Sequence, residues 1–143
     1  MVRKFREEDI LRVMELWLSG NLQAHPFIPG DYWRSNFAPV QEQISQAEIY
    51  VYESGQGIAG FVGLVDGYIA GIFVDADCRS HGVGKQLLDL AKEKYRELSL
   101  KVYEKNARAV SFYLREGFSI SAEGVDEDTG EAEYTMLWRA ERA

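Results

Sequence analysis

The stretch Arg79-Ser80-His81-Gly82-Val83-Gly84-Lys85 governs how the rest of this chain is interpreted. It follows an apolar run that ends at Val74 and precedes a segment with helical spacing of apolar residues. Two glycines one residue apart allow a sharp turn and leave backbone N–H groups uncovered. The N-terminus of the following helix carries about half a positive charge. Because Arg79, His81 and Lys85 add donors beside these amides, the stretch predicts a loop that binds a diphosphate.

The glycine spacing excludes two common phosphate-binding loops. A P-loop needs G-x-x-x-x-G-K-[ST], but Gln86 follows Lys85 and no glycine lies five positions before Gly84. A dinucleotide-binding fingerprint needs a third glycine where this chain has Leu87. The pattern present is R-x-x-G-x-G, and its plain alternative is a glycine-rich turn that binds nothing.

Composition limits the classes of function. The chain has 143 residues, 46% of them hydrophobic and 27% charged, which indicates one globular domain. A net charge of -7 argues against non-specific nucleic-acid binding. No apolar run reaches ~18 residues, so no membrane association is expected, and the N-terminus lacks the apolar stretch of a signal peptide. Cys78 is the only cysteine, so no internal disulfide can form, which fits a reducing compartment. We interpret Cys78 as a small residue in a turn rather than as a nucleophile. No Cys or His pair has metal-ligand spacing, so no metal is expected.

Hydrophobic periodicity predicts strands and helices in a mixed order. Strands are expected at residues 2–5, 48–53, 58–65, 68–74, 98–103, 118–122 and 134–138. Helices are expected from Glu7 to Gly20-Asn21, over residues 39–47, from the glycine loop to Tyr95, and from Asn106 to Arg115. Short turns make the second to fourth strands an antiparallel meander. The helix between the fourth and fifth strands makes a right-handed crossover, so those two strands are expected to be parallel.

Two further segments leave alternatives open. Residues 25–33 form a loop crowded with aromatic side chains, because two prolines and a glycine forbid a continuous helix. Its rings either cap the core or wall a substrate pocket. Residues 126–133 form an acidic turn, which is expected to be a solvated hairpin tip; if it overhangs the acceptor pocket instead, it would attract a cationic amine.

The order of elements, with R-x-x-G-x-G after the fourth strand and Asn106…Tyr113-x-x-x-Gly117-Phe118 after the fifth, resembles the GCN5-related N-acetyltransferase (GNAT) family. The resemblance covers residues 1–143 as one N-acetyltransferase domain. It implies an α/β (α+β) fold with a mixed, mostly antiparallel sheet of six to seven strands, helices on both faces, and the fourth and fifth strands parallel and splayed. The stretch His25-Pro26-Phe27-Ile28…Tyr32-Trp33-Arg34 is similar to the small bacterial YiaC/YjaB type. Ala76, where the family often has proline, is a minor departure.

The resemblance also implies acetyl-CoA as the cofactor. Its diphosphate would lie on the loop of Arg79, Ser80, His81, Gly82, Val83, Gly84 and Lys85. Its pantetheine arm would pair with the backbone of Ile72, Phe73 and Val74, and an N–H of Val74 or Phe73 would polarise the thioester carbonyl. Asn106 would hold the cofactor chain, or only cap its helix. Tyr113 would protonate the departing thiolate, or only pack in the core.

The function implied is a cytoplasmic enzyme, an N-acetyltransferase acting by direct transfer to a primary amine in a ternary complex. The acceptor is either a protein lysine or a small amine, and His25, Phe27, Tyr32 and Tyr68 are expected on its side of the site. The general base stays open between His25, a water chain, Glu53 and Glu104. A monomer or a homodimer fits equally. The alternative function is a non-catalytic acyl-CoA-binding or sensing module on the same fold, and a regulator that binds nucleotide phosphates is remote.

Overall fold

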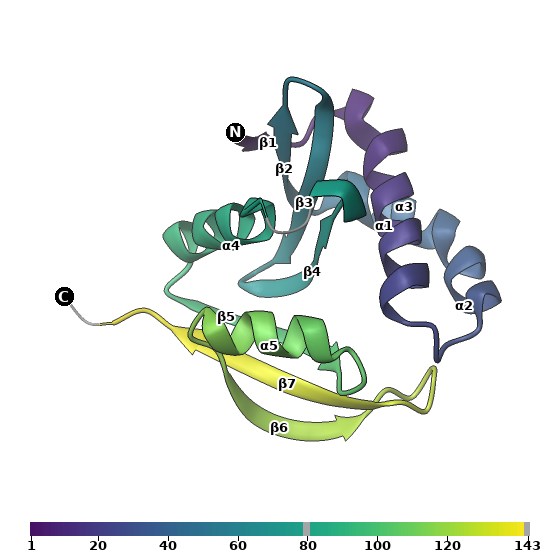
Figure 1. Ribbon diagram of the computed structural model, residues 1–143, viewed down its shortest axis with the longest axis vertical. Coiled ribbons are helices and arrows are strands. Elements are labelled where there is room, and N and C mark those ends of the chain that lie inside the picture. The colour runs from purple at the N-terminus through teal and green to yellow at the C-terminus, as the bar shows by residue number, and fades with distance from the viewer. Residues whose placement is uncertain (79–80, 142–143) are drawn as a thin grey trace.

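The computed structural model describes residues 1–78 and 81–141, and within them the chain forms a seven-stranded sheet in the order β1-β2-β3-β4-β5-β7-β6 (Figure 1). The strands are β1 (Val2–Lys4), β2 (Glu48–Ser54), β3 (Gly57–Val65), β4 (Tyr68–Val74), β5 (Glu97–Tyr103), β6 (Ser119–Val125) and β7 (Ala132–Arg139). β4 and β5 are parallel, and the other neighbouring strands are antiparallel. The predicted α/β fold with a mixed, mostly antiparallel sheet is confirmed.

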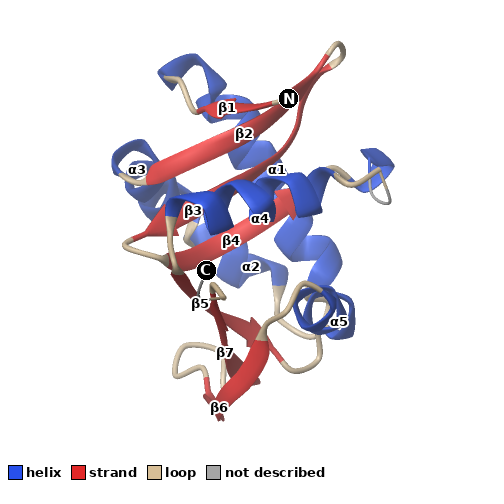
Figure 2. Cartoon of the chain, turned by 90° about the vertical axis from the view of Figure 1, so that its left-hand side faces the viewer, coloured by secondary structure: helices blue, strands red, loops and turns tan. Residues whose placement is uncertain are grey.

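The helices cover both faces of the sheet, as predicted (Figure 2). They are η1 (Glu7–Asp9), α1 (Ile10–Ala24), α2 (Gly30–Ser35), α3 (Phe37–Gln46), η2 (Ala76–Cys78), α4 (Val83–Lys94) and α5 (Ala107–Arg115). Residues of α1, α2 and α3 pack in one hydrophobic cluster, around Trp17, Trp33 and Phe61. Residues of α4 and α5 pack in the other, around Leu87 and Tyr113. Successive strand residues point to opposite faces, so β2 serves both clusters.

β4 leaves its neighbour soon after it begins. The β3–β4 register pairs Gly63 with Gly71 and Leu64 with Ile69, so Ala70 is an extra residue that makes a β-bulge on β4. β4 and β5 pair only through Tyr68↔Ser99 and Ile69↔Leu100. A bulge bends its strand and interrupts pairing, and beyond Ala70 the two strands separate. The predicted splay of the fourth and fifth strands is confirmed, although the bulge itself was not predicted.

The expected end of the first helix at Gly20-Asn21 is wrong, because α1 continues to Ala24. A Cβ on Gly20 would lie 2.8 Å from Phe73 Cδ1, so this glycine allows close packing of α1 on β4. Asn21 stays in the helix and donates from Nδ2 to the carbonyl oxygen of Trp17 at 2.9 Å.

The predicted loop over residues 25–33 is shorter than expected, because α2 begins at Gly30 and contains Tyr32 and Trp33. α3 begins at Phe37 rather than at Pro39, since a proline in the first turn costs no helical hydrogen bond. β6 continues to Val125, beyond its predicted end at residue 122. β7 already begins at Ala132, so the turn between the strands is shorter than the predicted acidic turn of residues 126–133.

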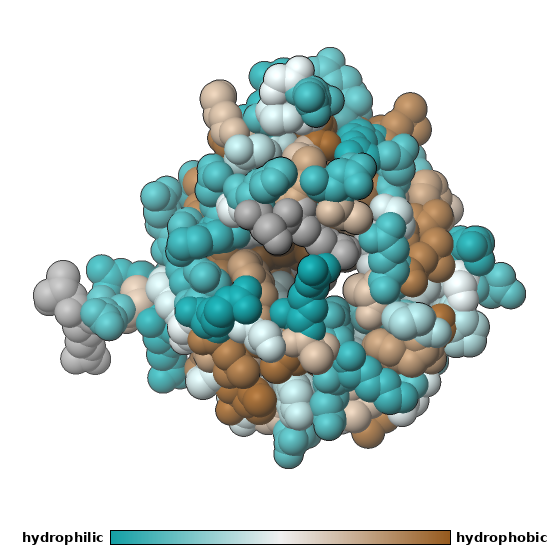
Figure 3. Space-filling model, in the orientation of Figure 1, coloured by the Kyte–Doolittle hydropathy of each residue, from teal (hydrophilic) through white to brown (hydrophobic). Residues whose placement is uncertain are grey.

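The face drawn in Figure 1 is hydrophilic over most of its area, with hydrophobic residues in small patches (Figure 3). Among the described residues, no helix is long and apolar enough to cross a membrane.

Candidate active site

A cavity of about 760 Å³ lies where β4 and β5 separate, and residues from both helix layers line it. From the α4–α5 layer these include Val83, Gly84, Lys85, Arg108, Phe112, Tyr113, Arg115 and Glu116. From the α1–α2 layer they include Trp17, Gly20, Asn21, Ala24, His25 and Trp33. The strands contribute Tyr68, Ala70, Gly71, Ile72, Phe73, Val74, Lys101, Val102, Tyr103 and Glu133, and the β6–β7 turn contributes Asp126. The cavity therefore reaches from one layer of helices to the other.

The turn before α4 exposes its backbone at one end of the cavity. Gly82 has φ 77°, in the left-handed region, and a Cβ built on it meets nothing within 4 Å. At Gly84 the nearest atoms to such a Cβ belong to Phe112 and Val74, at 3.6 and 3.7 Å. The first N–H groups of a helix have no partner within it, so this end of α4 suits an anion. Val83 is itself buried in the core and offers only its backbone.

The charged side chains expected beside this turn have different positions. Lys85 lines the cavity, but its Nζ is paired with Glu116 Oε1 at 3.0 Å and with Asp89 at 3.5 Å. His81 is exposed and does not line the cavity. Arg79 and Ser80 lie outside the described residues.

The free edge of β4 presents main-chain groups to the cavity. The N–H of Asp75 donates to the Ala59 carbonyl on β3 at 2.8 Å. Because N–H groups alternate in direction along a strand, the N–H of Val74 points away from β3, toward the gap. That of Phe73 points toward β3. Of the two amides expected to face the thioester, the geometry favours Val74.

Asn106 joins the start of α5 to the end of α1. Its Oδ1 accepts a hydrogen bond from the Ala109 N–H at 3.3 Å, so the predicted N-cap is present. Its Nδ2 lies 3.3 Å from Nε2 of His25. An amide nitrogen can only donate, so Nε2 accepts and the ring carries its proton on Nδ1.

His25 is enclosed by aromatic rings, which we call the aromatic cluster: Phe27, Trp33 and Tyr103. Its ring stacks on Trp33 at 5.3 Å and meets Tyr103 edge-on at 5.0 Å and Phe27 at 5.6 Å. Burial lowers the pKa of His25 to about 4, so the ring is neutral at neutral pH. Its Nδ1 and the Nε1 of Trp33 are buried without a hydrogen-bond partner among the residues described.

Tyr113 forms part of the inner wall of the cavity. Its ring packs edge-on against Phe112 and Phe118, at 5.2 and 5.4 Å, and it is 7% exposed. Burial, and then the neighbouring Tyr68, raise its pKa above the usual range, so the phenol stays protonated. Tyr113 packs in the core and also lines the cavity. A role in packing and a role as proton donor are therefore compatible.

The acceptor side of the cavity contains charged groups from β5, from β7 and from the turn between β6 and β7. Glu133 lies on β7 directly across from Tyr103 on β5, and Lys101 Nζ is 4.0 Å from its Oε1. Asp126 accepts a hydrogen bond from the Tyr103 hydroxyl at 2.5 Å. The acidic segment was expected to be a solvated tip, with an overhang of the acceptor pocket as the open alternative. Asp126 and Glu133 line the cavity, which fits that alternative. The run of acids was visible in the sequence, but its position at the cavity depends on the pairing of β5 with β7 and on the bond of Asp126 to Tyr103, which no local pattern specifies.

Other candidate residues lie elsewhere. Phe27 packs in the aromatic cluster but does not line the cavity. Tyr32 does not line the cavity either, and its hydroxyl lies 3.5 Å from Asp128. Glu53 pairs with Arg3 at 3.1 Å, away from the site. Glu104 is exposed and does not line the cavity.

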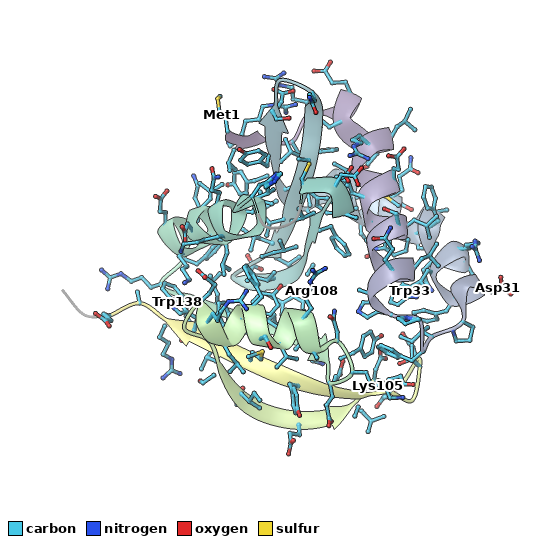
Figure 4. All side chains as sticks on the ribbon, in the orientation of Figure 1. Met1, Asp31, Trp33, Lys105, Arg108 and Trp138 are labelled. Atoms are coloured by element: carbon cyan, nitrogen blue, oxygen red, sulfur yellow. The ribbon has the colours of Figure 1, made fainter. Side chains whose placement is uncertain are left out.

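Two arginines of α5 were missed by the sequence analysis. Arg108 and Arg115 line the cavity, and Arg108 projects from the first turn of α5 toward it (Figure 4). Their position follows from the helix that Asn106 caps. No group of His, Cys, Asp and Glu within the described part of the chain has the arrangement of a metal site.

Comparison with known proteins agrees with this geometry. Residues 45–120 match a family model described as an acetyltransferase (GNAT) domain. The chain is 31% identical over 140 residues, 96% of each chain, to peptidyl-lysine N-acetyltransferase YiaC of Escherichia coli K12. The solution structure of apo YjaB from Escherichia coli has a TM-score of 0.85 at 24% identity, covering 99% of this chain and 98% of that one. A Bacillus anthracis structure assigned as a streptothricin acetyltransferase, in complex with acetyl coenzyme A, has a TM-score of 0.59 at 27% identity, covering 66% of this chain and 63% of that one.

Proposed function

This chain belongs to the acetyltransferase (GNAT) family, and on that premise we propose that it moves an acetyl group from acetyl-CoA to a primary amine bound in the same cavity. The observation that carries the proposal is the course of the cavity. Its lining includes both the exposed turn before α4, at Gly82 to Gly84, and the carboxylates of Glu133 and Asp126. The two substrates can therefore approach each other between β4 and β5, with no need for a covalent enzyme intermediate.

The residues on the α4 side suit a cofactor with a diphosphate and an amide-containing arm. Amides at a helix N-terminus bind phosphate oxygens, and Gly82 leaves those amides open. Arg108 and Arg115 add positive charge along the same wall. Lys85 can join them once a phosphate competes with Glu116 for its ammonium group. The unpaired edge of β4 offers hydrogen bonds to the arm, with the Val74 N–H directed at the position of a carbonyl oxygen.

Tyr113 supplies the proton that the departing thiolate needs. Its raised pKa keeps the hydroxyl protonated through the working range of pH. A thiol has a pKa of ~8.5 in water, and a thiolate formed in a buried cavity is more basic than in water, because burial disfavours its charge. Transfer from a phenol late in the reaction is then feasible.

We propose a lysine side chain of a protein as the acceptor. Three aromatic residues, Trp17, Trp33 and Tyr103, line the cavity together with the carboxylates of Asp126 and Glu133. Such walls suit a methylene chain, and the carboxylates suit the ammonium at its end. YiaC and YjaB, to which the chain is similar over most of its length, are named peptidyl-lysine N-acetyltransferases.

An amine panel tests both the reaction and the acceptor. Release of the CoA thiol is followed with lysine peptides, polyamines, aminoglycosides and free amino acids, and the products are identified by mass spectrometry. We expect turnover with lysine peptides, and acetylation at the ε-amine. Transfer to small amines alone would overturn the acceptor. Calorimetric binding of acetyl-CoA without transfer to any amine would overturn the reaction and favour a sensing module.

A further inference from the structure

We propose that Glu133 is the general base that removes a proton from the acceptor ammonium before attack. The inference rests on the proposed function, because it assigns a role within amine acetylation. An amine near neutral pH is almost entirely protonated, and its lone pair is free only after deprotonation. A base in hydrogen-bond reach of the ammonium is therefore needed.

Glu133 is placed on the acceptor side by strand register. It pairs with Tyr103, whose ring packs against His25 in the aromatic cluster. Directly opposed residues of antiparallel strands share a face of the sheet. The carboxylate thus faces the α1–α2 side, where the acceptor would enter, and its side chain is 16% exposed. Tyr113 lines the same cavity from the other face, so base and acid lie on opposite sides of the gap where β4 and β5 part.

The other carboxylates of the cavity are already engaged. Glu116 is paired with Lys85 at 3.0 Å on the cofactor side. Asp126 accepts hydrogen bonds from the Tyr103 hydroxyl at 2.5 Å and the Asp128 N–H at 2.9 Å. Burial opposes its ionisation, but these bonds hold its pKa below the usual value. Glu133 receives no side-chain hydrogen bond from the described residues, and its ion pair with Lys101 is long, at 4.0 Å.

His25 is a poorer base than Glu133 for two reasons. Its Nε2 is occupied by the Asn106 amide, at 3.3 Å. Its other nitrogen carries the ring proton and is buried. Burial also lowers its pKa to about 4, so it holds a proton weakly.

The charges that face Glu133 set its proton affinity. Burial raises its pKa, the ammonium of Lys101 lowers it, and Asp126 raises it. Tyr103 lies directly opposite it on β5, with its hydroxyl bonded to Asp126. Tyr68 on β4 is close enough to interact with its charge, because burial and then Glu133 raise the pKa of Tyr68. A carboxylate with a raised pKa is a stronger base than one in water, while Lys101 keeps it ionised.

The proton balance closes with the groups present. Glu133 takes one proton from R–NH₃⁺, and the amine lone pair forms the N–C bond at the thioester carbonyl. The C–S bond breaks as Tyr113 donates its proton to sulfur, and the second N–H proton, lost on collapse, restores the phenol. Glu133 then releases its proton to water, so one proton leaves per amide formed.

The test compares Glu133→Gln with the unmodified enzyme, using acetyl-CoA and a lysine peptide. We expect the kcat/KM for the peptide to fall by ~10² or more near neutral pH, with calorimetric acetyl-CoA binding unchanged. The loss should shrink as the pH rises, because more of the amine is already deprotonated. Glu131→Gln is the matched control on the same hairpin; Glu131 pairs with Lys105 at 3.1 Å and does not line the cavity. Asp126→Asn should cost much less than Glu133→Gln.

The variant Lys101→Met tests whether Glu133 acts as a base or only has a structural role. Removal of the ammonium raises the pKa of Glu133, so the acidic limb of the pH profile of kcat/KM should move to higher pH. An unmoved limb, an equal loss in Asp126→Asn, or full activity of Glu133→Gln would overturn the assignment while acetylation by the unmodified enzyme stands. An unmodified enzyme that acetylates no amine would overturn the proposed function instead.

Discussion

The Tyr113 phenol lies between two aromatic rings at the wall of the cavity, so a change to Phe removes one oxygen and leaves the packing in place. We expect Tyr113→Phe to lose ~10² to 10⁴ of turnover, the usual contribution of a positioned acid. Calorimetry should give the same affinity for acetyl-CoA, and the melting temperature should stay close to that of the unmodified protein. Turnover equal to that of the unmodified enzyme would remove the role from Tyr113.

Asn106 has two contacts, which two substitutions separate. Asn106→Ala removes the cap of α5 and should cost about 1 kcal/mol of unfolding free energy. Asn106→Ser keeps a capping oxygen but loses the amide that donates to His25, so its stability should lie close to that of the unmodified protein. Denaturant titration measures both. If acetyl-CoA affinity falls equally in the two variants, the amide binds the cofactor; an intact affinity in Asn106→Ser would leave the residue with its cap alone.

Residue types at fixed spacing were the part of the site that sequence could predict. Three predicted residues that line the cavity lie at a fixed offset from the start of a helix: Gly82 for α4, and Asn106 and Tyr113 for α5. Helix geometry then determines which way the side chains of Asn106 and Tyr113 point. Glu133 and Asp126 have no such offset. Glu133 reaches the cavity through the β5–β7 register, and Asp126 is held there by the hydroxyl of Tyr103. Both depend on contacts between residues distant in sequence.

At the scale of elements, the start of α4 depends on one left-handed residue. Gly82 has φ 77°, and a residue with a Cβ there costs roughly 1–2 kcal/mol. Gly82→Ala should therefore lower both the unfolding free energy and the affinity for acetyl-CoA, as the turn shifts to relieve the strain. Gly84→Ala is the matched control for folding, because its Cβ would make ordinary contacts at 3.6 Å and beyond. Equal stability of the two variants in thermal unfolding would contradict the argument.

Element boundaries show where local patterns were insufficient. The alternation of β2–β3–β4 and the cap of α5 are local, and those elements were predicted within one or two residues. Gly20 resembled a helix end, but its role is to let α1 approach Phe73. The bulge at Ala70 had one weak signal, a small residue next to Gly71 within a strand. Whether such a pair bends a strand depends on neighbours that the sequence does not display.

At the scale of the whole molecule, net charge bears on the choice of acceptor. The chain carries -7, and its acceptor side has two carboxylates against Lys101. A cationic lysine peptide should therefore be attracted over distance, and salt screens such attraction within ~10 Å at 0.1 M. We expect the KM for a lysine peptide to rise several-fold as salt is increased, measured by thiol release at saturating acetyl-CoA. A neutral amine acceptor provides the control, and an identical salt response for both acceptors would contradict charge steering.

The short pairing of β4 with β5 divides the sheet into a four-stranded plate (β1 to β4) and a three-stranded plate (β5, β7 and β6), which are joined along a seam by two residue pairs. A ligand whose amides form hydrogen bonds to both plates would add contacts across that seam. Heat or pulling force should then open the empty protein first along this line. Occupancy should raise the resistance of the seam by RT ln(1 + [L]/Kd), more than it affects either plate alone. The place where the reaction is proposed to occur is therefore also the place where the sheet is mechanically weakest.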